Sequence, residues 1–141
     1  PLPKYPSCLS ESLEKWAKAA PDRVFLAERN PEGAWRKLTY AEVLARVKEI
    51  AAALLQRGLS PDRPIAIISG NGVDHALLAL AAMHVGIPYA PVSAAYSLMS
   101  SDFGKLKTIV ALLTPGLVFA ADGNVFGKAI TAAVPETTER S

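Results

Sequence analysis

The sequence has 141 residues, the length of a single domain that can bury a hydrophobic core without disulfides or metal ions. Hydrophobic residues make up 50% of the chain and charged residues 20%, a composition that excludes an intrinsically disordered protein. The fifteen basic and thirteen acidic residues are spread along the chain and give a net charge of +2, so no nucleic-acid partner is predicted.

The cysteine content and the apolar segments bear on the compartment. Cys8 is the only cysteine, so no internal disulfide can form, and we expect it to be a small buried side chain on the first helix. The richest apolar run, residues 76–85, is much shorter than the ~18 residues of a membrane span, so it predicts a buried helix and no membrane partner. Residues 1–6, an extended Pro-rich lead, have the features of neither a signal peptide nor a transit peptide, and the expected location is the cytoplasm.

The first 40 residues predict a helix followed by a hairpin. Apolar residues recur at helical spacing between Leu9 and Ala20. Residues 24–28 and 35–38 are typical of strands, and the Asn-Pro-Glu-Gly sequence at residues 30–33 favours a turn between them. The pattern therefore predicts a β-hairpin.

A second helix is predicted after the hairpin. It begins with a capping box at residues 39–42, Thr-Tyr-Ala-Glu, in which the Thr hydroxyl and the Glu carboxylate accept hydrogen bonds from each other's backbone N–H groups. The helix runs to about residue 57, where Gly58 fits the left-handed position that ends a helix.

The second half of the chain alternates short uncharged apolar runs with helical segments. Strands without polar alternation are covered on both faces, and helical crossovers make neighbouring strands parallel. The fold class predicted is therefore α/β, a partial doubly wound and mostly parallel sheet with flanking helices, preceded by the N-terminal β-hairpin. The predicted strands are residues 65–68, 89–92 and 117–120, and the predicted helices are residues 73–85, 102–113 and 125–133.

The middle helix of this half is apolar nearly all round, which is typical of a helix buried on every side. A three-stranded sheet with one helix layer would not cover it, so we expect more chain or a partner to pack over it. Residues 1–134 are accordingly predicted to be an α/β subdomain of a longer protein, and residues 135–141 a cut or flexible tail.

The residues offer little catalytic chemistry. Residues 69–72, Ser-Gly-Asn-Gly, follow a strand and open a helix, but His75 stands where the dinucleotide fingerprint needs its third Gly, so a tight turn with an Asx-type cap is the better interpretation. His75 and His84 are nine residues apart, and structural roles are predicted for both rather than metal binding. Asp74 and Asp102 are expected to stabilise helix starts. No catalytic residue and no metal ligand is predicted.

Several segments together resemble the opening α/β layer of the adenylate-forming enzymes, a superfamily that includes acyl-CoA synthetases, luciferases and peptide-synthetase adenylation domains. They are residues 38–42, 62–71, 74–83, 86–93 and 93–97. Three short motifs are similar to those of feruloyl-CoA synthetases in particular: Ser-Gly-Asn, Pro-Tyr-Ala-Pro-Val-Ser and Ala-Tyr-Ser-Leu-Met-Ser. The resemblance covers about residues 6–133.

The resemblance implies the N-terminal portion of an AMP-forming acid–CoA ligase. Such a ligase activates an aryl (feruloyl-like) or acyl carboxylate with ATP and Mg²⁺ to an acyl-adenylate and transfers the acyl group to coenzyme A. The family's Ser/Thr/Gly-rich phosphate loop ending in Pro-Lys does not occur in these residues, nor does its adenine and magnesium motif. The 141 residues alone are therefore expected to be inactive and to bind none of these cofactors.

One segment is a candidate ligand contact. The resemblance implies that Ser93, Ala94 and Ala95 line the path by which the pantetheine arm of coenzyme A reaches the active site. Ala94 stands where many relatives have Pro. An ordinary strand-to-helix connection, whose small residues merely suit the turn, is the alternative.

The resemblance also implies a partner for the whole chain. The expected partner is the remainder of the same synthetase chain, and the isolated chain could self-associate through an exposed apolar face. A non-catalytic interaction module derived from a synthetase paralogue would show the same apolar surface. The sequence does not identify the carboxylic acid, because the acyl pocket of these enzymes is built mainly from downstream segments.

Overall fold

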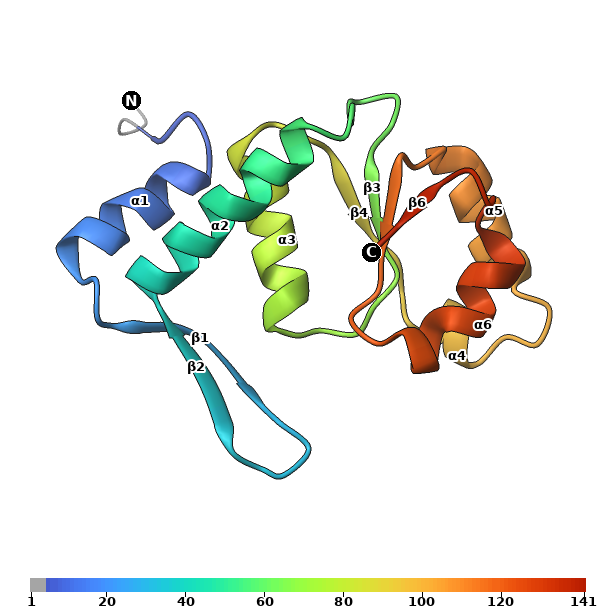
Figure 1. Cartoon of the computed structure of the whole chain (residues 1–141), viewed down its shortest axis with the longest axis horizontal. Coiled ribbons are helices and arrows are strands. Elements are labelled where there is room, and N and C mark those ends of the chain that lie inside the picture. The colour runs from blue at the N-terminus through green and yellow to red at the C-terminus, as the bar shows by residue number, and fades with distance from the viewer. Residues whose placement is uncertain (1–4) are drawn as a thin grey trace.

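The computed structural model describes residues 5–141 and shows an α/β fold with a separate hairpin (Figure 1). Residues 1–4, most of the expected Pro-rich lead, lie outside the described residues. In chain order the elements are α1 (Ser10–Ala19), β1 (Val24–Arg29), β2 (Trp35–Thr39), α2 (Tyr40–Leu55), β3 (Ile65–Ile67), α3 (Val73–His84), β4 (Tyr89–Pro91), α4 (Ala95–Leu98), α5 (Gly104–Leu113), β5 (Leu117–Phe119), α6 (Gly123–Ala133) and β6 (Glu139–Arg140).

A parallel sheet forms the centre of the molecule, with strand order β4-β3-β5-β6. Ile65 and Ile67 belong to the core shared with α1, α2 and α3, whereas Ala66 and Ile68 belong to the core shared with α5 and α6. Figure 1 shows these helix groups on opposite sides of the sheet. The doubly wound architecture predicted from the uncharged strands is confirmed.

The chain itself covers the apolar helix α3. Asp74 is the one exposed residue of this helix, and the others are buried or half-buried. Helix α2 packs along α3, and α1 and β1 also touch it (Figure 1). The premise that the chain itself leaves α3 uncovered is therefore wrong: α1 and α2 supply a second layer, and their packing could not be inferred from α3 alone.

Local signals around α2 behave as predicted. Thr39 N–H donates to Glu42 Oε2 at 2.7 Å and Glu42 N–H donates to Thr39 Oγ1 at 3.3 Å, which completes the capping box. After the helix, Gly58 has a φ of +59°, a left-handed conformation that favours glycine.

The β1–β2 hairpin projects away from the sheet (Figure 1). Its strands are antiparallel, as predicted, with Leu26 opposite Leu38 and Arg29 opposite Trp35. Most of its residues are exposed, and Leu38 is the buried exception. At the base of the hairpin, Phe25 stacks on Tyr40 with 4.5 Å between ring centroids, which ties the hairpin to α2.

Three features differ from the sequence predictions. The tail at residues 135–141 is not free of structure: β6 pairs with β5, and Ser141 N–H donates to Val118 O at 3.0 Å. The short helix α4 follows β4 where only a connection was expected. Cys8 is exposed rather than buried, because it precedes α1 instead of lying on its inner face.

Candidate functional site

A cleft opens at the carboxyl ends of β3 and β4, which is where doubly wound sheets bind ligands. It has a volume of about 460 Å³. We call it the β3–β4 cleft. It is lined by Ser69, Gly70, Asn71, His75, Pro91, Val92, Ser93 and Ala94.

Ser69 ties together the loops that leave β3 and β5. The side chain is buried, and its Oγ accepts a hydrogen bond from Ala121 N–H at 3.2 Å. The loop after β3 leads to α3 on one face of the sheet, and the loop after β5 leads to α6 on the other face. Ser69 therefore connects the two loops at the topological switch point of the fold, where successive connections pass to opposite faces of the sheet.

The histidines of α3 have different surroundings. His75 Nδ1 lies 3.2 Å from Gly70 O, so with its proton on Nδ1 the ring donates to that carbonyl and closes the loop after β3. This agrees with the structural role predicted for His75. His84 Nδ1 is buried without a hydrogen-bond partner among the described residues, so no hydrogen bond at this atom supports the structural role predicted for His84.

The three predicted ligand contacts lie together after β4. Ser93, which is exposed, and Ala94, which is half-buried, line the β3–β4 cleft. Ala95 begins α4 beside them and is not among the lining residues. Ser93 O accepts from Tyr96 N–H at 3.1 Å, so the small residues also form a tight turn into α4.

The start of α3 is capped from a distance. Gly72 makes no side-chain cap, and Val73 N–H donates instead to Glu28 Oε2 at 2.7 Å. The predicted Asx-type cap from the Ser69–Gly72 loop is therefore wrong. Sequence reasoning missed Glu28, because nothing local marks a partner 45 residues away.

The two predicted helix-start aspartates both lie at helix beginnings. Asp74 is in the first turn of α3 and forms an ion pair with Arg36. Asp102 accepts from Gly104 N–H at 3.0 Å and from Ser100 Oγ at 2.9 Å, and these hydrogen bonds, the Gly104 N–H foremost, lower the pKa of the Asp102 carboxyl.

The donor set for a metal ion is poor. Within residues 5–141 no three His, Cys, Asp or Glu side chains gather closely enough to hold a cation. The described residues therefore do not fit a Mg²⁺ site. None of the helices within the described part of the chain has the length and apolarity that crossing a membrane requires.

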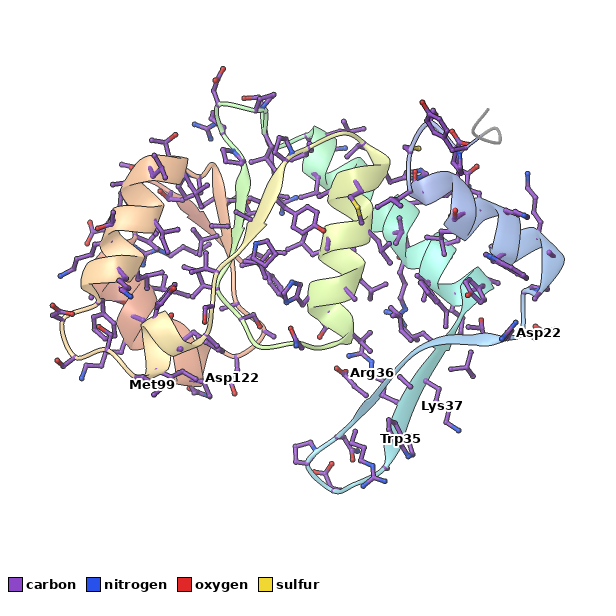
Figure 2. All side chains as sticks on the ribbon, turned by 180° about the vertical axis from the view of Figure 1, so that it is seen from behind. Asp22, Trp35, Arg36, Lys37, Met99 and Asp122 are labelled. Carbon is purple, nitrogen blue, oxygen red and sulfur yellow. The ribbon has the colours of Figure 1, made fainter. Side chains whose placement is uncertain are left out.

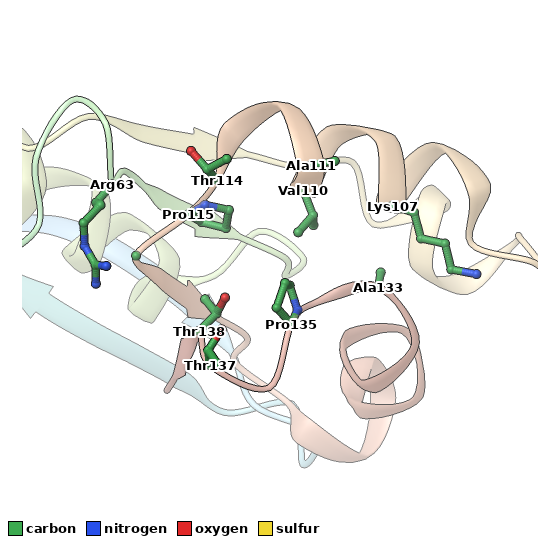
Figure 3. Close-up of a pocket in the computed structure, with 11 residues that line it drawn as sticks. Arg63, Lys107, Val110, Ala111, Thr114, Pro115, Ala133, Pro135, Thr137 and Thr138 are labelled. Carbon is green, nitrogen blue, oxygen red and sulfur yellow. The ribbon is translucent and has the colours of Figure 1, made fainter.

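A second cavity, of about 320 Å³, lies at the opposite end of the sheet (Figure 3). Its walls include Thr114 just before β5 and Pro135, Thr137 and Thr138 of the tail. Its two cationic side chains, Arg63 and Lys107, are exposed and lie at opposite ends of the cavity, so they do not converge on one ligand (Figure 3).

The fold is a doubly wound α/β fold with a cleft at the carboxyl ends of β3 and β4, the edge at which such sheets generally bind ligands. The family model described as AMP-binding enzyme matches residues 13–138. The chain therefore belongs to the AMP-binding enzyme family.

Comparison with known proteins gives both sequence and fold relatives. A dimodular nonribosomal peptide synthase of Bacillus subtilis is 29% identical over 90 residues, which cover 64% of this chain and 4% of that protein. A fatty acyl-adenylate ligase of L. pneumophila, solved with acyl adenylate and pyrophosphate, superposes with a TM-score of 0.76 at 19% identity, over 95% of this chain and 23% of that one. The N-terminal subdomain of Klebsiella oxytoca NpsA superposes with a TM-score of 0.71 at 18% identity, covering 95% of this chain and 30% of that one.

These likenesses show that the fold is that of the N-terminal subdomain of adenylate-forming enzymes. The chain spans less than a third of each of these structural relatives. The sequence relative is a peptide synthase, and the solved relative is an acyl-adenylate ligase, so the match does not single out feruloyl-CoA synthetases.

Proposed function

We propose that this chain is the opening part of a ligase that activates a carboxylic acid with ATP to an acyl-adenylate. The observation that carries the proposal is the family match over residues 13–138, which spans nearly every described element. The resemblance to feruloyl-CoA synthetases in residues 69–71, 88–93 and 95–100 supports an aryl (feruloyl-like) or acyl acid as substrate and coenzyme A as acceptor.

The 141 residues alone would be inactive. They contain no Ser/Thr/Gly-rich phosphate loop, and no three metal-ligating side chains cluster within the described residues. ATP and Mg²⁺ would therefore be bound by parts of the ligase outside this chain, and its natural partner would be the remainder of the same protein. What this chain supplies is the β3–β4 cleft and the sheet beneath it.

We assign Ser93, Ala94 and Ala95 to the path of the pantetheine arm. The position of Ser93 and Ala94 in the wall of the β3–β4 cleft supports this role. Small side chains leave room for a thin, extended arm to pass close to the backbone, as Gly does where a ligand approaches closely. The tight turn into α4 explains the same residues without a ligand, so the two interpretations need an experiment to separate them.

The test is made in the longer ligase, with two half-reactions measured separately. Ala94→Phe and Ala95→Phe should slow thioester formation roughly 5- to 150-fold, equivalent to about 1–3 kcal/mol, because the bulky ring obstructs the thiol. Carboxylate-dependent pyrophosphate exchange should stay within a few-fold of the parent, since adenylation does not use this route.

A matched control is Ala132→Phe, on an exposed part of α6. It should change neither half-reaction. If Ala94→Phe and Ala95→Phe leave thioester formation intact, or lower both half-reactions together, the segment is a structural turn and the pantetheine assignment is wrong.

A further inference from the structure

The β1–β2 hairpin is bonded to the start of α3 by a chain of three charged side chains. Glu28 Oε2 accepts from Val73 N–H at 2.7 Å, and Glu28 Oε1 accepts from Arg36 Nη1 at 2.9 Å. Arg36 Nη2 then donates to Asp74 Oδ1 at 3.0 Å. Figure 2 shows Arg36 on the hairpin next to the N-terminal end of α3.

The hydrogen bond from Val73 N–H to Glu28 satisfies a backbone donor at the start of α3. The first N–H groups of a helix have no acceptor within the helix, and Gly72 has no side chain to supply one. A carboxylate at this position also meets the positive end of the helix dipole. A Cβ on Gly72 would lie 3.1 Å from Glu28 Oε2, so the glycine leaves the space that the carboxylate occupies.

The hydrogen bond to the backbone is the stronger part of this arrangement. The side chains of Glu28, Arg36 and Asp74 are 31%, 39% and 53% exposed, so their ion pairs contribute little by themselves. A bond from an N–H group to an ionised carboxylate is about twice as strong as a neutral one. Arg36 therefore acts mainly by holding Glu28 in place.

The loop that precedes α3, residues 69–72, also borders the β3–β4 cleft. Asn71 and Gly72 line a small hollow beside the hairpin together with Leu26, Ala27 and Glu28. Asn71 also lines the β3–β4 cleft, together with Ser69 and Gly70. The loop at residues 69–72 is thus held between the hairpin and the cleft.

We propose that Glu28 and Arg36 are positioning residues that clamp the hairpin to α3 and fix the loop at residues 69–72 along the β3–β4 cleft. The part of the proposal that concerns the cleft as a ligand path rests on the proposed function. The clamp itself does not, because it can be tested on this chain without ATP, acid or coenzyme A.

The test is amide hydrogen exchange measured by NMR on the 141-residue chain. Val73 N–H lies in the first turn of α3 and has Glu28 as its acceptor, so its protection reports the clamp directly. Ile68 N–H, bonded to Phe119 O at 2.8 Å in the central sheet, reports global unfolding. The two amides separate a local opening from a general loss of stability.

Glu28→Ala should speed exchange at Val73 roughly 10- to 100-fold with Ile68 nearly unchanged, since a hydrogen bond to a charged group is lost. The amide resonances of residues 69–72 should shift as well. Glu28→Gln keeps an acceptor oxygen and should restore much of the protection. Glu32→Ala, an exposed carboxylate in the turn of the same hairpin, should have no effect.

Arg36→Ala should speed exchange at Val73 a few-fold, and its exposed neighbour Lys37 gives the control Lys37→Ala. The clamp is refuted if Val73 exchanges alike in Glu28→Ala and Glu32→Ala, if Ile68 accelerates equally, or if Glu28→Gln restores nothing. Equal effects of Arg36→Ala and Lys37→Ala would remove Arg36 from it.

Discussion

Hydrogen bonds from Thr39, the backbone N–H first and the hydroxyl second, lower the pKa of the Glu42 carboxyl at the start of α2. A carboxyl with a lowered pKa in the folded chain stabilises the fold while it is ionised. This contribution is complete above its ordinary value of about 4.3 and is lost as the pH falls through the lowered value.

Replacing Glu42 should therefore make the free energy of unfolding depend less steeply on pH in the acid range. Between about pH 6 and pH 3, the wild-type chain should lose more stability than Glu42→Gln, measured as the urea midpoint at each pH. Glu49→Gln, on an exposed position of the same helix, is the control and should follow the wild type. Identical pH profiles for Glu42→Gln and the wild type would contradict a role for the ionised carboxylate.

Residue contacts were predictable from the sequence when both partners were local. The capping box places its two residues three apart, so the pattern itself specifies the contact. Glu28 and Val73 are 45 residues apart and meet only after α3 has packed beside the hairpin. For the same reason the residues that face Ser93 and Ala94 across the cleft emerged only from the structure, and the ligand contact of these two residues stays a prediction from family resemblance.

At the scale of elements, the two faces of the sheet are stabilised by separate cores. Leu106 on α5 is fully buried in the core shared with α6, whereas Leu112 on the same helix is 82% exposed. The pair offers a matched comparison of one residue type in one helix.

Leu106→Ala should lower the free energy of unfolding by about 2–5 kcal/mol, since it removes buried apolar atoms and leaves a cavity. Leu112→Ala should change it by no more than about 0.5 kcal/mol. Urea denaturation measures both. Similar losses for the two variants would mean that α5 does not present Leu106 to the sheet.

Strands and helices with strong patterns were predicted, and weakly patterned ones were not. Uncharged runs such as residues 65–68 indicate buried strands, because a parallel sheet covers both faces. Strand β6, Glu-Arg, carries no apolar signal and lies in place through backbone bonds to β5 and the ion pair of Glu139 with Arg57. Only pairing with β5 identifies it as a strand.

At the scale of the whole molecule, exposed apolar side chains remain although α3 is covered. Met99 is 85% exposed and Leu98 54% exposed at the end of α4, and Val125 on the neighbouring helix α6 is 48% exposed. Solvated apolar surface of this kind favours association. We propose that the isolated chain self-associates through it.

Sedimentation velocity over a range of concentrations checks this proposal. The expected result is a weight-average mass that rises with concentration, and a lower mass for the double variant Leu98→Lys, Met99→Lys. A constant monomer mass at high concentration would contradict self-association.

The central claim is that this chain is the opening part of a carboxylate-activating ligase, and ATP–pyrophosphate exchange tests it most directly. The assay compares the 141-residue chain with the protein encoded by the complete reading frame, each with Mg²⁺ and a panel of hydroxycinnamic, fatty and amino acids. We predict carboxylate-dependent exchange by the longer protein, greatest with a hydroxycinnamic acid such as ferulate, and none by the 141 residues alone. No exchange by the longer protein with any acid, or exchange by the isolated chain at a comparable rate, would contradict the account.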